Sequence, residues 1–302
     1  MRSSVVDRIF YRAQKNKDIF LVTGDAGFGV LDQYRDRLPR RFLNLGVAEQ
    51  NMISFSAGLA LAGYKVFIYN IIPFLLYRCY EQVRNDICYQ RLPITLVGIG
   101  SGVTYAPLGV THYSIEDIAL ARTMPNLVIL SPSDPVEAVA CADYALRAKT
   151  PVFIRLAKTG EPVLHSKPIK DILSPIVVQS GRGVAVIFHG SVSCEVMAAL
   201  MRIKQKPLVI SMPCLSPIND AALKKHLRGI GRVITVEEHF IDGGLGTIII
   251  EWAARNNVSI EVEKMGITNE FIHSIKNNSG MREHYGIDAA AIENKIKEFF
   301  NG

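Results

Sequence analysis

Short runs rich in β-branched and aromatic residues alternate with longer helical patterns along most of this 302-residue chain. The first strand-like runs lie at 19–23, 42–45, 65–69, 94–97, 127–130 and 152–155. Segments with helical spacing separate them, at 49–62, 74–89, 114–123 and 134–148. A repeated strand–helix–strand order, with strands that are apolar on both faces, predicts a parallel sheet covered by helices on both sides.

The segment 161–183 interrupts this alternation. It contains Pro162, Pro168 and Pro175 among Lys and Ser residues, which is typical of a domain linker. The alternation then restarts with strand-like runs at 184–188, 208–211, 232–236 and 259–263, and a last helix is expected at 289–299. We therefore predict two parallel-sheet α/β domains, at 1–165 and 183–302, joined by a linker at 166–182.

Composition excludes several classes of protein. Hydrophobic residues make up 49% of the chain and charged residues 21%, as in globular proteins. No apolar run approaches the roughly 20 residues of a membrane span, and the first residues lack the apolar core of a signal peptide. The net charge of +6 is spread along the chain, which argues against a nucleic-acid interface. We expect a cytoplasmic protein that binds neither membrane nor nucleic acid.

Glu49 is the most informative single residue. It follows a predicted strand and the turn residue Gly46, and it stands where a helix of small and apolar residues begins. A carboxylate in such a place must find a hydrogen-bond partner or take up a proton. The residue types alone are equally consistent with a catalytic acid and with a carboxylate that stabilises the helix N-terminus.

An ordered set of motifs resembles the transketolase family. The set consists of Thr23-Gly24-Asp25, Gly46-Val47-Ala48-Glu49-Gln50-Asn51-Met52, Arg78-Cys79-Tyr80-Glu81-Gln82, Gly109-Val110-Thr111-His112 and Val236-Glu237-Glu238-His239 with Gly243-Gly244-Leu245-Gly246. The resemblance extends over the whole chain but covers only the second half of a full-length transketolase. It implies a thiamine diphosphate-binding pyrimidine domain followed by a transketolase C-terminal domain.

The resemblance assigns Glu49 a role in catalysis. The matching glutamate binds N1′ of the thiamine aminopyrimidine and favours the imino tautomer, which removes the C2 proton of the thiazolium. A desolvated acid is suited to this exchange with a ring nitrogen. Asp25, in the first motif, is implied to contact the cofactor as well.

The helix that begins near Pro73 resembles the segment that stacks on the pyrimidine. Alignment on Arg78 places Leu75 where the family usually has an aromatic residue. Phe74 or Tyr77 would stack instead if the helix start shifts by a residue, since a flat heteroaromatic ring needs an aromatic surface. We therefore expect Phe74, Leu75, Tyr77 and Arg78 near the cofactor, although each aromatic residue is equally consistent with ordinary helix packing.

His112 lies in a predicted loop, and the resemblance implies that it contacts donor oxygen atoms and handles protons. Four residues earlier the family carries an acidic residue that reads sugar hydroxyls, whereas this chain has Leu108. That departure opens the choice of donor between a ketose phosphate and a 2-keto acid. Lys158 and Arg2 match positions that bind substrate phosphate, although a surface role fits both residues almost as well.

The motif Glu237-Glu238-His239 fits a structural role, because the C-terminal domain of the family serves assembly. The chain lacks the Gly-Asp-Gly and later Asn residues that hold the diphosphate through a divalent cation, so we expect no metal site here. The resemblance implies that Mg2+ or Ca2+ binds through a diphosphate-binding N-terminal transketolase subunit. An obligate hetero-oligomer follows, which we expect to be an α2β2 heterotetramer with self-association of this chain.

The expected function is a transketolase-like transferase subunit for carbohydrate metabolism. It would move a two-carbon ketol or acyl unit from a ketose or 2-keto acid donor to an aldehyde or sugar acceptor. Two alternatives stay open: a 2-oxo acid dehydrogenase β-type subunit, and a non-catalytic assembly paralogue.

Overall fold

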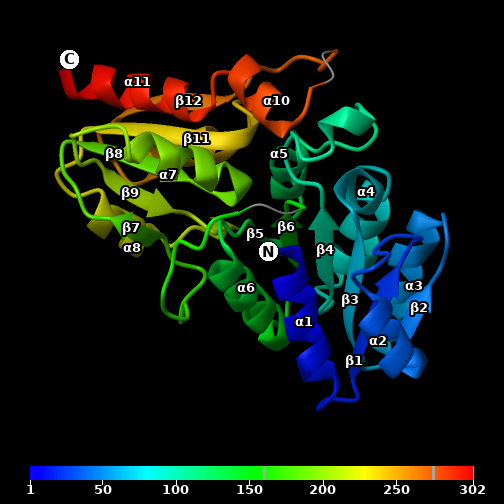
Figure 1. The fold of residues 1–302 in the computed structure, drawn as a ribbon. Helices are drawn as coiled ribbons and strands as arrows, with labels where there is room; N and C mark the ends of the chain where they lie inside the picture. The colour runs from blue at the N-terminus through cyan, green and yellow to red at the C-terminus, as the bar shows by residue number, and fades with distance from the viewer. Residues whose placement is uncertain (159–160, 274–275, 302) are drawn as a thin grey trace.

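The computed structural model describes residues 1–158, 161–273 and 276–301. It contains two sheets with helices against their faces, and Figure 1 shows the two α/β units side by side. The chain begins at the junction between the units, and its last helix lies on the outer side of the second unit.

The first sheet has seven strands in the order β10-β5-β6-β4-β3-β1-β2. Six are parallel, and only β10 runs antiparallel, against β5. The strands are β1 (Ile19–Thr23), β2 (Phe42–Asn44), β3 (Lys65–Ile71), β4 (Thr95–Ile99), β5 (Val128–Leu130), β6 (Val152–Leu156) and β10 (Cys214–Ser216). Strands β3, β4 and β6 are almost entirely buried, as expected for strands covered on both faces.

Helices α1 and α6 pack against each other beside this sheet, where Arg8 of α1 pairs with Asp143 of α6. The helices of this unit are α1 (Arg2–Ala13), α2 (Asp32–Arg37), α3 (Glu49–Leu61), α4 (Tyr80–Gln82), α5 (Asp117–Arg122) and α6 (Pro135–Arg147). The predicted helix at 74–89 is divided into π-helical turns η2 (Pro73–Tyr77) and η3 (Val83–Tyr89) with α4 between them.

The second sheet has five strands in the order β12-β11-β8-β9-β7. Only β7 is antiparallel to its neighbour. The strands are β7 (Ile176–Gln179), β8 (Val184–Phe188), β9 (Leu208–Ser211), β11 (Arg232–Phe240) and β12 (Glu261–Ile267). The helices are α7 (Ser193–Leu200), α8 (Asp220–His226), α9 (Leu245–Arg255), α10 (Asn278–His284) and α11 (Ala289–Asn301).

The predicted fold class, two parallel-sheet α/β domains, is confirmed. The sequence did not predict α1, α2, α10, β7 or β10, and β7 lies inside the segment 166–182 that was expected to be a linker. The domain boundaries themselves stay a prediction. Across the described residues, no helix is both long enough and apolar enough to cross a membrane.

The two units share apolar core. One continuous cluster joins Val22 and Ile68 of the first sheet to Ile187 of the second sheet and Trp252 of α9, all of them buried. Strand β10 strengthens the junction, because it follows β9 of the second sheet in the chain but pairs with β5 of the first. The second unit is therefore packed directly against the segments that follow the first sheet's strands.

Candidate active site

The motif residues gather at one edge of the first sheet. Strands β1, β2, β3, β4 and β6 are parallel, so their carboxyl ends meet there. Sites in such sheets form where the chain leaves these ends. Asp25, Glu49, Phe74, His112 and Lys158 each follow a different one of these strands, which places the predicted site in the loops of this edge.

Glu49 is the first residue of α3, and it is only 5% exposed. Its neighbours in the helix include the fully buried Met52 and Ile53. Arg78 Nη1 donates a hydrogen bond of 2.9 Å to Glu49 Oε1. Among the described residues no other side chain bonds the Glu49 carboxylate, so Oε2 is available to a ligand.

Arg78 links Glu49 to an aromatic ring. The backbone N–H of Arg78 donates to Pro73 O, five residues earlier, which closes the π-helical turn η2. Residues four apart lie on one face of such a turn, and the Arg78 guanidinium lies 4.5 Å from the centroid of the Phe74 ring. The arrangement combines an ion pair with a cation–π contact on the same arginine.

The Phe74 ring in turn contacts His112. The two ring centroids are 5.3 Å apart and the planes are nearly perpendicular, at 76°. His112 Nδ1 shares a hydrogen bond of 2.8 Å with Thr111 Oγ1. Glu49, Arg78, Phe74 and His112 thus form one continuous chain of contacts, which we call the Glu49–His112 cluster.

The other two predicted cofactor contacts on this helix lie elsewhere. Leu75 is fully buried in the apolar core, so its side chain faces no open space. Tyr77 is partly buried, and its hydroxyl lies 2.8 Å from Ser114 Oγ. Of the three candidates for stacking, only Phe74 joins the Glu49–His112 cluster.

Asp25 is exposed and has a left-handed backbone, with φ of 50°. Asn44 Oδ1 accepts from the backbone N–H groups of both Asp25 (2.8 Å) and Gly46 (3.0 Å). This side chain joins the loop after β1 to the loop that leads into α3. Asp25 therefore lies beside the turn that precedes Glu49, as expected of a residue in the same site.

Arg2 and Lys158 both lie near Tyr105, away from the Glu49–His112 cluster. Lys158 Nζ lies 5.9 Å from the centroid of the Tyr105 ring. Burial raises the pKa of Tyr69 to about 12 and also raises that of Tyr105, while the nearby positive charge of Arg2 opposes both shifts. Arg2 Nε is buried without a hydrogen-bond partner among the described residues. Two cationic side chains near one tyrosine are an electrostatic match for an anion.

The sequence did not indicate Tyr105 as a site residue. A methyl group at Gly100, where φ is +89°, would lie only 2.3 Å from Tyr105 Cδ2, so the ring packs directly on this backbone. The available signal was an aromatic residue after a glycine-rich strand end, Gly98-Ile99-Gly100-Ser101-Gly102. That signal becomes specific only when Arg2 and Lys158 are placed beside it.

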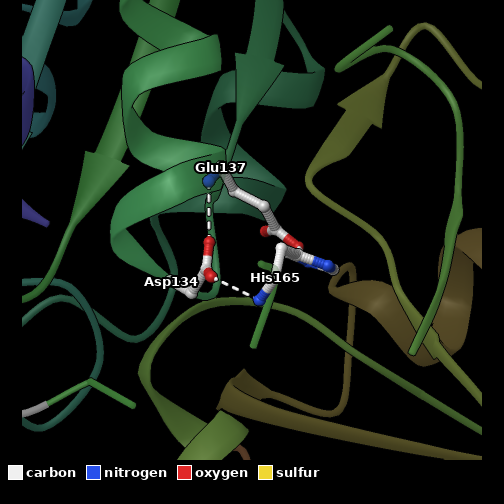
Figure 2. Close-up of side chains that lie close together, drawn as sticks. All are labelled: Asp134, Glu137 and His165. Atoms are coloured by element: carbon white, nitrogen blue, oxygen red, sulfur yellow. Dashed lines mark hydrogen bonds and ion pairs between the residues drawn. The ribbon is translucent and has the colours of Figure 1, made fainter. Parts of the chain in front are cut away.

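A separate group of Asp134, Glu137 and His165 has potential metal-ligand atoms within 4.8 Å of one another. Figure 2 shows that the three residues already bond one another and the backbone. Asp134 accepts from the N–H groups of Glu137, Leu164 and His165, while Glu137 Oε2 accepts from Ser133 N–H. The carboxylates thus start helix α6 and hold the chain that follows β6, and we assign no metal to them.

His165 gives this group a pH dependence. Its hydrogen bond of 2.8 Å with the buried Glu137 raises the His165 pKa, against the opposing effect of burial. A folded pKa above the unfolded one means stabilisation that is fully present below the unfolded value and is lost as pH rises through the folded value. The wild type should therefore lose about 1 kcal/mol of unfolding free energy relative to His165→Gln as pH rises from about 6 to about 9.

Urea denaturation at several pH values measures this difference, with His284→Gln on the exposed end of α10 as the control. A difference between wild type and His165→Gln that does not change with pH would contradict the assignment.

Two family models match the chain. The transketolase pyrimidine-binding domain matches residues 6–160, and the transketolase C-terminal domain matches residues 175–292. Together these matches cover both sheets, with Glu49, Phe74, Arg78 and His112 all inside the first range.

The chain is also similar to individual proteins over nearly its full length. It is 33% identical to an apulose-4-phosphate transketolase subunit of Actinobacillus succinogenes, covering 95% of this chain and 94% of that protein. It is 32% identical to the subunit of the same name from Phocaeicola vulgatus, covering 99% and 96%. A solved structure, a split gene transketolase in an inactive beta4 tetramer, superposes with a TM-score of 0.88 at 27% identity, covering 99% and 97%.

Proposed function

Because the chain belongs to the transketolase family, we propose that it is the pyrimidine-binding subunit of a two-subunit, thiamine diphosphate-dependent transferase. This proposal rests on the Glu49 carboxylate, which is buried at the start of α3 with one oxygen free and is linked through Arg78 to the Phe74 and His112 rings. A decayed paralogue has no need to keep a carboxylate in that position, where its desolvation is costly.

The residues present fit a flat heteroaromatic group. Glu49 Oε2 supplies a polar atom for a ring nitrogen, and the half-buried Phe74 supplies an aromatic surface. A methyl group built at Gly46 or Gly109 would meet nothing within 4 Å, so these two turns border open space. Thiamine diphosphate, when bound, supplies the electron sink that allows a carbon–carbon bond next to a ketone to break.

Each residue of the Glu49–His112 cluster has a separate task in this proposal. Glu49 exchanges a proton with the pyrimidine through Oε2, while Arg78 holds Oε1 and fixes the direction of the carboxylate. Phe74 packs against the ring, and Asp25 borders the same turn. His112 presents its Nε2 to donor oxygen atoms, because Nδ1 is bonded to Thr111.

Arg2 and Lys158 are proposed to bind the phosphate of a sugar-phosphate substrate. The Lys158 ammonium lies over the Tyr105 ring and the charge of Arg2 acts on the same tyrosine, and two such cations suit a dianion better than a neutral group. The relatives from Actinobacillus succinogenes and Phocaeicola vulgatus are both named for a sugar phosphate, which agrees with a phosphate site. We therefore place sugar phosphates first among the substrates and 2-keto acids second.

The diphosphate and its Mg2+ or Ca2+ are proposed to bind through an N-terminal transketolase subunit. The oxygen-rich group at Asp134 already uses its oxygens in bonds to the protein and follows β5, away from Glu49. The relatives from Actinobacillus succinogenes and Phocaeicola vulgatus are each named as one subunit of a transketolase, which implies a partner for them. An α2β2 heterotetramer with contacts between copies of this chain is the proposed assembly.

Reconstitution tests the proposal. The purified chain with thiamine diphosphate and Mg2+ should give no measurable turnover, and addition of the diphosphate-binding subunit should produce it. A coupled assay of ketol transfer measures the rate, and size-exclusion chromatography with light scattering measures the assembly. Turnover by the chain alone would refute the split site, and an inactive but fully assembled complex would favour a non-catalytic paralogue.

A donor screen on the same complex tests the consequence of Leu108. This side chain is 57% exposed and apolar, so it cannot bond a sugar hydroxyl. Sites that pair a hydroxyl discriminate strongly against analogues without it, so we expect xylulose 5-phosphate to have no strict advantage over other ketose phosphates and 2-keto acids. A strict preference for xylulose 5-phosphate would contradict this expectation, whereas reduction of lipoamide would indicate a 2-oxo acid dehydrogenase subunit.

A further inference from the structure

The motif Glu237-Glu238-His239 ends strand β11 of the second sheet and faces the segment that carries His112. Glu238 Oε2 accepts from Val103 N–H at 3.4 Å, and His239 Nε2 accepts from Ala119 N–H at 3.3 Å. The next residue, Phe240, donates its N–H to Ile115 O at 2.7 Å. Three consecutive residues of the second unit thus bond the segment 103–119 of the first.

Glu237 has a different task. Its oxygens accept from the N–H groups of Leu245 and Gly246, which begin α9. The side chain is completely buried, and burial, which raises its pKa, is outweighed by the hydrogen bond and charge of His189 and the charge of His239, so that the pKa is lowered. Glu237 therefore organises its own unit, whereas Glu238 and His239 bond the first unit, and Glu238 does so with a carboxylate oxygen.

Ser114, two residues after His112, anchors the loop through backbone hydrogen bonds. Ser114 and Gly102 exchange backbone hydrogen bonds of 2.8 and 3.0 Å, which close the base of the loop. Arg155 Nη2 donates to Ser114 O at 3.2 Å and to Glu238 O at 2.9 Å, while Arg155 Nε donates to Asp117 Oδ2 at 2.7 Å. Arg155 is only 1% exposed, so it acts within the protein and does not contact substrate.

One oxygen of Glu238 bonds only its own unit, and the other bonds both units. Oε1 accepts from Arg282 of α10, in the second unit, at 2.6 Å from Nε. Oε2 accepts from Val103 N–H in the first unit and from Ser191 Oγ. The contact with the loop is close, because a methyl group at Gly102 would lie 2.2 Å from Glu238 Oε2. A buried polar network whose members all have hydrogen-bond partners is rigid, so the bonds of Glu238 to its own unit fix the oxygen that bonds the loop.

We propose that Arg155 and Glu238 are positioning residues that fix the His112 loop between the two units. The C-terminal domain thereby contributes to the geometry of the active site in addition to assembly. The proposal rests on the proposed function of His112, because the value of holding this loop depends on what His112 does. Displacing a reacting group by even about 1 Å can cost as much as 10²-fold in rate.

Glu238→Gln and Glu195→Gln form a matched pair for the test. Both carboxylates accept from Arg282, but Glu195 bonds Ala289 N–H in its own unit and is not hydrogen-bonded to the loop. Glutamine at position 238 has one acceptor in place of two, so it satisfies either Arg282 or Val103. Only the Glu238 variant should loosen the loop.

Hydrogen–deuterium exchange of the purified chain gives the first readout. Amides in 101–116 of Glu238→Gln should exchange about 10-fold faster than in wild type, while the rest of the chain and Glu195→Gln stay within about 2-fold. In the reconstituted complex, kcat per bound cofactor should fall about 10-fold for Glu238→Gln with the Kd for thiamine diphosphate unchanged. Arg155→Lys should likewise lower kcat without changing the Kd for thiamine diphosphate, since a lysine cannot make the forked contact.

The two readouts separate the possible failures. Unchanged exchange in 101–116 would show that Glu238 does not hold the loop. Faster exchange with an unchanged kcat would show that holding the loop does not position His112. An equal fall in kcat for Glu195→Gln would reduce Glu238 to a structural residue. If the wild-type complex has no turnover, the proposed function fails, while the exchange result still decides whether Glu238 holds the loop. If Glu238→Gln does not fold, Glu238→Asp against Glu195→Asp makes the same comparison, because aspartate keeps the charge beside Arg282 with a shorter reach.

Discussion

Glu49→Gln is expected to slow proton exchange at C2 of bound thiamine diphosphate by about 10²–10⁴ in the reconstituted complex, the scale of a lost acid–base partner. The amide keeps the size of the carboxylate but cannot exchange a proton with a ring nitrogen at neutral pH. Hydrogen–deuterium exchange at C2, followed by NMR after acid quench at saturating cofactor, measures this step before any substrate is added.

The fold should survive this change. Arg78 Nη1 bonds only Oε1 of Glu49, and the amide oxygen of glutamine can accept the same bond. The N-cap residue Ala48 makes no side-chain hydrogen bond, and loss of the Glu49 charge in the first turn of α3 costs the helix about 0.3–1 kcal/mol. We expect the free energy of unfolding and the assembly with the partner subunit to change little.

Glu81→Gln is the matched control. Glu81 lies on α4, three residues after Arg78, and its side chain is exposed, so the same loss of charge occurs outside the Glu49–His112 cluster. Its C2 exchange rate should equal that of the wild type. If Glu49→Gln also exchanged at the wild-type rate, Glu49 would only support the helix N-terminus, and the central assignment would be wrong.

The sequence predicted the strands that are buried on both faces because their β-branched runs are unambiguous. It did not predict β7 and β10, for physical reasons that concern their length and their pairing. Strand β7 follows Pro175 in a segment of weak periodicity, and β10 has only three residues, between Pro213 and Pro217. Both are antiparallel edge strands whose pairing depends on neighbours that local patterns do not reveal.

The candidate site was predictable only in part. Glu49 was identifiable from the ordered family motifs, because its residue type alone fits a helix-stabilising carboxylate equally well. In the structure Glu49 contacts Arg78, which leads to Phe74 and His112. The register of the stacking residue was not predictable, because the π-helical turn at Pro73–Tyr77 changes which side chains face the core. That turn buries Leu75 and leaves Phe74 in the Glu49–His112 cluster. The cofactor role of each residue stays a prediction.

The bonds of Arg155 and Glu238 had no local signal at all. Arg155 looked like any basic residue at a strand end, and its partners Asp117, Ser114 and Glu238 are distant in sequence. Their contacts follow from the packing of the two units against each other. The local sequence pattern carries no information about that packing.

Arg155→Met is expected to destabilise the protein by about 3–5 kcal/mol, the scale of removing one partner from a buried ion pair. Asp117 is completely buried, and its Oδ1 already has no hydrogen-bond partner among the described residues. Loss of the Arg155 Nε bond to Oδ2 leaves the charge uncompensated, and two backbone oxygens, of Ser114 and Glu238, lose a donor. A loss of this size is a large fraction of a typical free energy of unfolding, which is about 5–15 kcal/mol.

Urea denaturation of the purified chain measures the loss, and a double-mutant cycle identifies its cause. Arg155→Met combined with Asp117→Leu removes both charges, so it should recover much of the stability lost in the single variant. Arg8→Met is the control: Arg8 makes two hydrogen bonds with Asp143 between α1 and α6, but their side chains are 32% and 23% exposed. A pair that solvent reaches contributes at most about 1 kcal/mol. If the double variant were no more stable than Arg155→Met, the loss would come from altered packing and not from the unpaired Asp117 charge.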